Sequence, residues 1–292
     1  MKQVAASFKS HGDRCAAVLY LPDKVRKPPV VVMAHGFGAE SDLRLPDYAE
    51  RFVKRGLAVF LFDYRTFGQS EGSPRKWVSP RRHLADWQEA IAHVRTRKDV
   101  DASRMGLWGT SFSGGHALVT AARVKGVSAV VAQVPFVDGL ASTLQFDLRY
   151  QMEAVGHGLK DIFRMATLQP AYRVPIVSPP DRFGVLNTPE SEPGFKVLLP
   201  PGYQFDNSCP ARVLLNVPLY RPISHAKKIP CPVLLLYGEK DTLIPAKSVE
   251  KTGKRIKNCT LVPLPVGHFE PYLGEMFEKT VKMEADFLVK NL

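Results

Sequence analysis

The feature that most constrains the fold of this chain is the alternation of short apolar runs with helical segments along much of its length. The β-branched run Pro29–Ala34 is typical of a strand buried on both faces. After Ser79 and Pro80, a helix N-cap and first-turn pair, apolar residues recur at helical spacing, with Trp87 and Ile91 on one face. Strands that alternate with helices form parallel sheets covered on both faces. The sequence therefore predicts an α/β fold with a mostly parallel, doubly wound sheet.

The other elements before residue 136 follow from the same periodicities. We expect helices over 45–55 and 112–124, the second one rich in small residues. The expected strands, besides Pro29–Ala34, are 3–8, 14–21, 58–64, 105–109 and 127–134.

The alternation of predicted strands and helices is interrupted between residues 137 and 228. A single helix is expected over 142–165, and residues 170–232 hold 13 of the 24 prolines, which favours rigid turns over regular sheet. The alternation then resumes with strands at 232–237 and 260–263, a helix at 245–256 and a closing helix. We therefore expect a core of residues 1–136 and 229–292, with a helical and irregular insertion, 137–228, lying over the sheet as a lid.

Composition excludes several function classes. The chain has 292 residues and a net charge of +12, but its cations are dispersed and no aromatic ladder interleaves them, so nucleic-acid binding is not indicated. The longest apolar runs are too short for a membrane span. Four scattered cysteines and no secretory signal pattern favour a cytoplasmic protein without disulfides or a zinc site.

The strongest chemical signal is the segment 107–115, which contains Gly109-Thr110-Ser111-Phe112-Ser113 between a predicted strand and a predicted helix. A serine on such a tight turn presents its hydroxyl at the edge of the sheet, provided that the residues two positions before and after it are small. Gly109 and Ser113 meet that requirement. Ser111 is therefore the candidate nucleophile.

A serine hydroxyl needs a general base, and the base needs an acid that orients it. Asp241 follows the apolar strand at 232–237 and His268 follows the next strand, so both lie at the edge where loops of a parallel sheet converge. Asp138, which follows an earlier strand, is an alternative acid, and Glu239 is another. His35 and Asp63 also end strands, and we interpret them as residues that organise loops.

The segment around Ser111 resembles the nucleophile elbow of the α/β-hydrolase superfamily, G-x-S-x-G, with Ser113 in place of the second glycine. The order Ser111, Asp241, His268 matches the order that this superfamily uses. Residues 63–72 together with 109–115 are similar to the dienelactone-hydrolase-like and polyketide transferase-like group. The resemblance implies that backbone amides of Phe37, in the loop after Pro29–Ala34, and of Phe112 form the oxyanion hole.

These observations predict a serine hydrolase that cleaves small-molecule carboxylic esters, or thioesters, through an acyl-enzyme on Ser111, without a cofactor or metal. An acyltransferase with the same triad, a peptidase and a non-enzymatic binding module are the alternatives. The sequence leaves the oligomeric state open, a homodimer included. The expected walls of an apolar substrate pocket are four aromatic residues: Phe136, Phe146, Tyr150 and Phe163.

Overall fold

A central sheet of eight strands organises the molecule. The computed structural model describes residues 1–292. The strand order is β1-β4-β6-β5-β7-β8-β11-β12; the two edge pairs β1/β4 and β4/β6 are antiparallel and all other neighbours are parallel. The predicted α/β architecture is confirmed. The strands are β1 (Lys2–Ala5), β4 (Ala17–Leu21), β5 (Pro29–Ala34), β6 (Ala58–Phe62), β7 (Asp101–Thr110), β8 (Ala129–Gln133), β11 (Val233–Gly238) and β12 (Cys259–Leu264).

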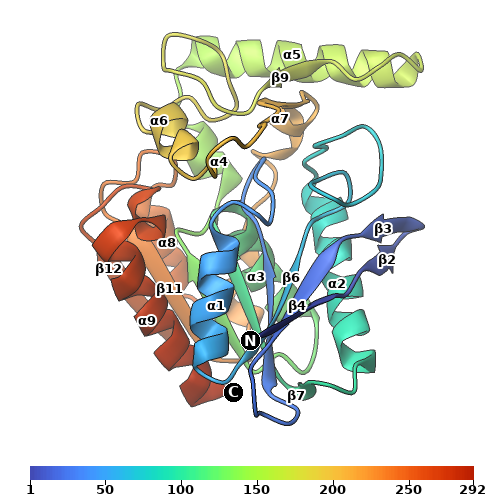
Figure 1. Ribbon diagram of the computed structural model, residues 1–292. Helices are drawn as coiled ribbons and strands as arrows, with labels where there is room; N and C mark the ends of the chain where they lie inside the picture. Colours follow the sequence, from blue (N-terminus) through green and yellow to red (C-terminus); the bar gives the residue numbers. More distant parts are fainter.

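Helices cover both faces of this sheet (Figure 1). On one face lie α1 (Leu45–Lys54) and α9 (Gly274–Asn291), which contact each other. On the other lie α2 (Pro80–Thr96), α3 (Phe112–Arg123) and α8 (Ala246–Gly253). Strands β5, β6, β8 and β11 are buried almost without interruption because helices cover them from both sides.

The beginning of the chain differs from the prediction of two plain strands. Besides β1 and β4 there is a separate antiparallel ribbon, β2 (Phe8–Ser10) and β3 (Asp13–Cys15). The two residues between these strands, His11 and Gly12, both have positive φ, which is the geometry of a tight hairpin turn whose twist matches its strands. Breaks at Ala6–Ser7 and at Ala16 also divide each of the two predicted strands, so that four shorter strands result.

The segment between β8 and β11 adds no strand to the main sheet and lies above its carboxyl edge (Figure 1). The predicted single helix over 142–165 is wrong in detail, because Asp147 caps a new helix through the backbone N–H of Tyr150 and so divides it. The proline-rich part also contains one small two-stranded sheet. The elements of this insertion are α4 (Gly139–Thr143), α5 (Leu148–Ala166), β9 (Arg173–Pro175), α6 (Ser191–Lys196), β10 (Ser208–Pro210), α7 (Val213–Asn216) and the 3₁₀ helix η1 (Pro222–Lys228).

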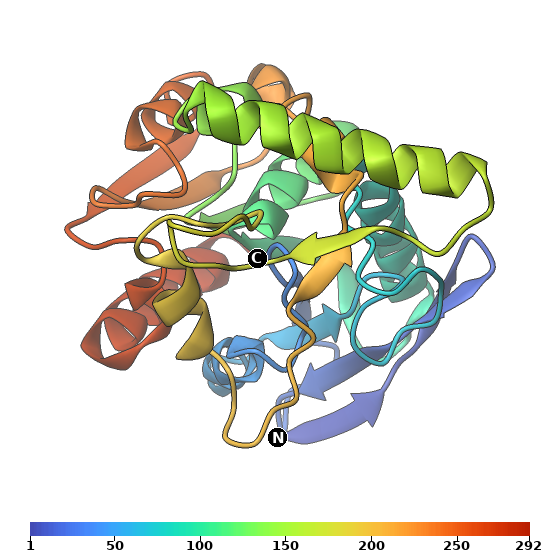
Figure 2. The same ribbon diagram turned by 90° about the horizontal axis from the view of Figure 1, so that it is seen from above.

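Seen from above, α5 crosses the top of the molecule, over the ends of the central strands (Figure 2). Trp87 and Trp108 are fully buried in the core, as their sequence context indicates. None of the helices combines the length and the apolar character that crossing a bilayer requires. The remaining 3₁₀ helix, η2 (Glu270–Tyr272), links β12 to α9.

Candidate active site

Ser111 occupies a strained turn between β7 and α3. Its φ is 54° and its ψ is −123°, a conformation that side chains other than glycine rarely adopt. The turn closes tightly, because a Cβ on Gly109 would lie 2.3 Å from the carbonyl oxygen of Ser113. Ser113 itself is fully buried, and its Oγ lies 2.8 Å from the hydroxyl of Tyr64. Serine thus fills the position where the resembling motif has glycine, and it gains a hydrogen bond there.

Three side chains from separate loops meet at this turn. Ser111 Oγ lies 3.0 Å from Nε2 of His268, and Nδ1 of the same imidazole lies 2.7 Å from Oδ2 of Asp241. The other carboxylate oxygen of Asp241 accepts hydrogen bonds from the backbone N–H groups of Leu243 and Ile244, both at 2.8 Å. The carboxylate is therefore held by its own loop, and it can fix the tautomer of the imidazole.

The alternative acids lie in other surroundings. Asp138 forms a bidentate ion pair with Arg221, with both N–O distances 2.8 Å, and caps α4 through the backbone N–H of Ala141. Glu239 is exposed. Of the three acids that the sequence left open, only Asp241 contacts His268.

The electrostatics of His268 reflect two opposing influences. Burial of the imidazole is the largest single influence, and by itself it lowers the pKa of His268. The adjacent carboxylate of Asp241 more than offsets it, through charge and hydrogen bonding, and Glu190 and Glu270 add further negative charge nearby. The net result is a pKa of His268 above its ordinary value, as suits a base that carries a proton transiently.

The residues assigned to an oxyanion hole lie beside Ser111. Phe112 is the first residue of α3, so its amide has no acceptor within the helix. Phe37 belongs to the loop after β5, and this loop passes so close to the turn that a Cβ on Gly36 would lie 3.0 Å from Cβ of Ser111. The rings of Phe37 and Phe112 pack edge to face, 5.4 Å apart. The backbone of the loop after β5 and the first residue of α3 thus both lie next to Ser111.

His35 and Asp63 are buried behind that loop. The Nδ1 atom of His35 lies 3.0 Å from the carbonyl oxygen of Gly36, and burial lowers the pKa of this histidine to about 4. Asp63 accepts a hydrogen bond of 2.7 Å from the backbone N–H of Ser41. Their contacts are to loop backbone, in agreement with their interpretation as residues that organise loops.

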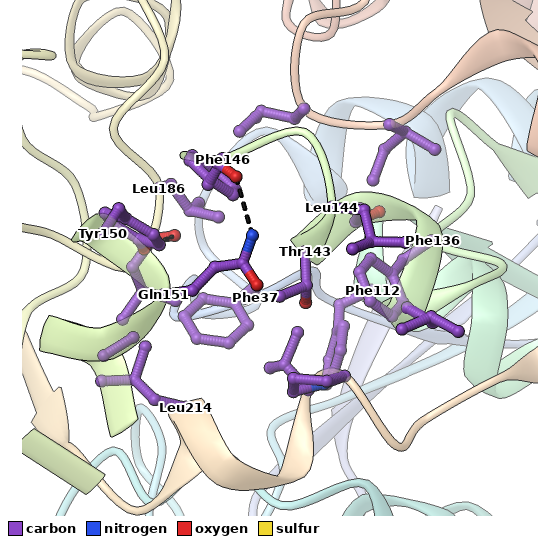
Figure 3. Close-up of a pocket in the computed structure, with 18 of the residues that line it drawn as sticks. Phe37, Phe112, Phe136, Thr143, Leu144, Phe146, Tyr150, Gln151, Leu186 and Leu214 are labelled. Carbon is purple, nitrogen blue, oxygen red and sulfur yellow. Dashed lines mark hydrogen bonds between the residues drawn. The ribbon is translucent and has the colours of Figure 1, made fainter. Parts of the chain in front are cut away.

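A largely apolar cavity of about 290 Å³ opens next to Ser111 and His268. Of its 21 lining residues 15 are hydrophobic, and none is a lysine, arginine, aspartate or glutamate. In Figure 3, Phe112 and Phe136 of the core lie on the right, Tyr150 and Leu214 of the insertion lie on the left, and Phe37 lies between them with Phe146 above. Three of the four predicted aromatic walls, Phe136, Phe146 and Tyr150, therefore line the cavity.

The fourth predicted wall, Phe163, is wrong. Its side chain is 64% exposed and does not line the cavity. The buried face of α5 is formed by Ala154, Gly158 and Asp161, and a residue two positions after Asp161 points to nearly the opposite side of a helix. The position of Phe163 around the axis of α5 decides that its side chain points outward. The irregular sequence around this helix gave no pattern from which that position could be predicted.

Glu190 is a site residue that sequence reasoning missed. One carboxylate oxygen accepts from the backbone N–H of His268 at 2.8 Å, and the other accepts from the N–H and the hydroxyl of Thr242, both at 2.6 Å. Glu190 lies in the proline-rich insertion, in no motif, and nothing in the sequence relates it to residues 52 and 78 positions away.

Nowhere do three or more His, Cys, Asp or Glu side chains gather in a group that could hold a metal ion.

Sequence comparison finds relatives of this chain among known proteins. The quorum-quenching protein AidA of Acinetobacter baumannii is 37% identical over 281 residues, which cover 96% of this chain and 92% of that protein. The thiohydrolase aneE of Aspergillus aculeatus is 39% identical over 110 residues, 38% of this chain and 35% of that protein. The family model of the X-Pro dipeptidyl-peptidases (S15 family) matches residues 11–152.

Among solved structures, the α/β hydrolase GrgF of Penicillium sp. sh18 superposes with a TM-score of 0.87 at 21% identity, over 100% of this chain and 99% of that one. Its fold is the one described above. The extended similarity to AidA covers both the core and the insertion. The chain therefore has the α/β-hydrolase fold and belongs to the family of the quorum-quenching protein AidA.

Proposed function

We propose that the chain is a serine hydrolase that cleaves neutral small-molecule carboxylic esters or thioesters with apolar acyl groups. The observation that carries the proposal is the relay from Asp241 through His268 to Ser111, with distances of 2.7 and 3.0 Å, next to a cavity without charged walls. A cytoplasmic location is part of the proposal, because all four cysteines are free thiols and reducing compartments maintain thiols.

The reaction proceeds in two halves. His268 removes the hydroxyl proton as Ser111 Oγ attacks the carbonyl carbon, and the amides of Phe37 and Phe112 stabilise the resulting oxyanion. The protonated imidazole, held by Asp241, gives its proton to the departing alcohol or thiol, which leaves an acyl group on Ser111. Water, deprotonated by His268, then attacks the acyl carbonyl and releases the carboxylic acid and the free serine.

The insertion acts in this proposal as a lid that provides the acyl pocket. Residues 137–228 contribute Phe146, Tyr150 and Leu214 to the cavity, while the core contributes the reacting groups. A pocket of apolar side chains favours apolar acyl chains, at about 0.8 kcal/mol for each buried methylene. Small-molecule esters are accordingly the proposed substrates.

Peptidase activity of the S15 type is less well supported. An exopeptidase that recognises a free amino terminus needs a negative charge to bind the ammonium group. No carboxylate lines the cavity beside Ser111. Acyl transfer uses the same acyl-enzyme and differs only in the acceptor; it is the second candidate because the polyketide transferase grgF of Penicillium sp is 32% identical over 113 residues.

The direct test is the intact mass after treatment with a fluorophosphonate, for the native protein and for Ser111→Ala. A single adduct that maps to residue 111 and is absent from the variant is the expected result. An unmodified native protein, or an adduct that persists in Ser111→Ala, would contradict the proposal. Acyl p-nitrophenyl esters and acyl thioesters, each with and without an added alcohol, then distinguish hydrolysis from transfer by the product formed.

A further inference from the structure

The insertion does more than cover the pocket, because Glu190 reaches from it into the catalytic loops. The carboxylate bridges the loop that carries Asp241, through Thr242, and the loop that carries His268, through that residue's own N–H. Two loops of the core that end different strands, β11 and β12, are thereby fixed to each other by one side chain of the insertion. This contact is independent of the cavity walls.

The surrounding packing leaves the bridge little freedom. A Cβ on Gly267 would lie 2.4 Å from Oε2 of Glu190, so the backbone before His268 passes directly against the carboxylate. A Cβ on Gly194 would lie 2.2 Å from the ring of Phe269, which brings the next turn of the insertion equally close to the same loop. The segment 190–194 is therefore in close contact with the histidine loop.

We propose that Glu190 is a positioning residue, which holds His268 in register with Asp241 and Ser111 and adds negative charge that favours the protonated imidazole. The inference rests on the proposed function. A carboxylate suits this task because all three groups that it meets are donors, two N–H groups and one hydroxyl, and it can accept from all of them. An amide cannot, because its NH₂ would face a donor at one end.

The test compares Glu190→Gln with two matched controls. Glu192→Gln removes a charge from α6, the short helix that follows Glu190, where Glu192 pairs with Lys196 at 2.7 Å. Glu270→Gln removes a charge close to His268 but breaks no hydrogen bond to either loop. Steady-state ester hydrolysis is measured from pH 5 to 9, and kcat is expressed per serine that a fluorophosphonate titrates, so unfolded protein does not count.

For Glu190→Gln we expect kcat per titrated serine to fall about ten- to a hundredfold with little change in KM, because misplacement of a reacting group affects the chemical step. The acid limb of kcat/KM should also move to lower pH, since less negative charge surrounds His268. Glu270→Gln should shift the acid limb of kcat/KM but leave kcat per titrated serine unchanged. Glu192→Gln should change neither quantity.

Two results would overturn the positioning role. An unchanged kcat per titrated serine and an unmoved limb, with only fewer titratable serines, would make Glu190 a stability residue. If the native protein shows no Ser111-dependent ester hydrolysis, the proposed function itself is wrong. That result is obtained before any Glu190 variant is made.

A second, independent observation concerns the outer face of α5. Seven apolar side chains form a stripe along the turn after α4 and along α5, with exposures from 37% to 70%. The members of this α5 stripe are Leu144, Leu148, Met152, Val155, Leu159, Ile162 and Phe163. From Leu148 to Ile162 they alternate in steps of four and three, the spacing of a helix that packs along a second helix. No other element lies over α5 in the view from above (Figure 2).

We propose that a second copy of this chain covers the α5 stripe, with the two α5 helices antiparallel across a two-fold axis. Seven such side chains, at about 100 Å² of exposed area each, offer on the order of 700 Å², close to the roughly 800 Å² per partner of standard interfaces. Gly156, in the middle of the exposed side, has open space around its Cβ position, so its own fold does not require glycine there. A partner helix would therefore have room to approach closely at this position.

The partner would also affect the substrate pocket. Leu144 and Val155 belong both to the stripe and to the cavity wall, and they are 65% and 48% exposed. The mouth of the cavity therefore lies beside the stripe. A partner helix on the stripe would cover this mouth and exclude water from the acyl chain.

Sedimentation velocity at micromolar concentration tests this interface. We expect the native protein and the control Val289→Glu, on the distant helix α9, to be dimers, and the double variant Leu148→Glu, Leu159→Glu to be a monomer. Gly156→Cys should form an intermolecular disulfide on oxidation, whereas Val289→Cys should not.

A monomeric native protein, or a double variant that stays dimeric, would overturn the dimer. Co-sedimentation with vesicles of phosphatidylcholine and phosphatidylglycerol separates one specific failure. If the native protein is a monomer that binds these vesicles through Leu148 and Leu159, the stripe faces lipid and the proposal is wrong.

Discussion

The core and the insertion hold their side chains by different means. In the core, Ser111, Asp241 and His268 follow strands of one parallel sheet, so backbone hydrogen bonds between strands determine where their loops begin. The insertion has only two strands of three residues each and relies on polar side chains. At its centre the fully buried Asp161 accepts hydrogen bonds from the N–H groups of Tyr172 and Arg212 and pairs with the guanidinium of Arg212 at 2.6 Å.

The difference indicates which part of the molecule places the reacting groups and which part shapes the cavity. A sheet fixes geometry over many backbone contacts, so the reacting groups tolerate sequence change elsewhere. The insertion depends on single side chains, and these decide the shape of the cavity and the contact through Glu190. The reacting groups therefore belong to the core, whereas the insertion contributes part of the cavity wall and the contact through Glu190. The following predictions test this division, from the largest expected effect to the smallest.

The largest effect is expected in the core. Asp241→Asn should lower kcat by about 10⁴-fold, because an amide no longer selects the tautomer or stabilises the imidazolium. Asp138→Asn, at the rival acid, should leave kcat within a few fold and affect only the pair with Arg221. Steady-state kinetics on one p-nitrophenyl ester compare the two variants. Equal losses in both would contradict the assignment of the acid.

In the insertion, the largest effect is on stability. Asp161→Ala leaves the guanidinium of Arg212 buried without its partner, which typically costs about 3–5 kcal/mol. Urea unfolding should show an early transition of the insertion, before the core unfolds. The matched change Asp206→Ala, at an exposed pair with Arg173, should cost less than about 1 kcal/mol. A single unchanged transition for Asp161→Ala would show that this pair does not organise the insertion.

Selectivity should change with the insertion alone. Phe146→Ala removes a cavity wall that stacks on Tyr150 with 4.4 Å between ring centroids, and we expect KM for long-chain acyl esters to rise about tenfold. The KM for acetate esters and kcat should change little. Phe163→Ala, an aromatic truncation outside the cavity, should leave the chain-length profile as it is. If KM for long-chain esters rose equally in both variants, the assignment of Phe146 to the pocket wall would be wrong.

The smallest effect concerns a core group with no role in the reaction. Glu284 is fully buried, and burial raises its pKa to about 8, although Trp108 donates a hydrogen bond to it at 2.9 Å. Since the folded-state pKa lies above that of the unfolded chain, its contribution to stability is present below about pH 4.5 and is lost as the pH rises through about 8. Glu284→Gln should flatten this dependence in urea unfolding, with kcat unchanged. An identical slope in both proteins would refute the assignment.

How much the sequence predicted follows the same division. The strands, helices and their order were predictable in the core because buried strands and amphipathic helices leave a periodic pattern, and the positions of Ser111, Asp241 and His268 followed from strand ends. In the insertion the pattern is weak. The break between α4 and α5, the outward orientation of Phe163 and the role of Asp161 were all beyond periodicity, since each depends on contacts between distant residues.

The sequence by itself determined the sheet, the turn that carries Ser111 and the choice of His268 as the candidate base. These depend on local signals: alternating hydrophobicity, small residues around a serine, and polar residues directly after apolar runs. Only the tertiary structure decided between Asp241 and Asp138 as the contact of His268, and only it brought Glu190 of the insertion to the catalytic loops. The physical reason is that a side chain's hydrogen-bond partners depend on how separate loops pack, and no local pattern encodes a distance across 78 residues.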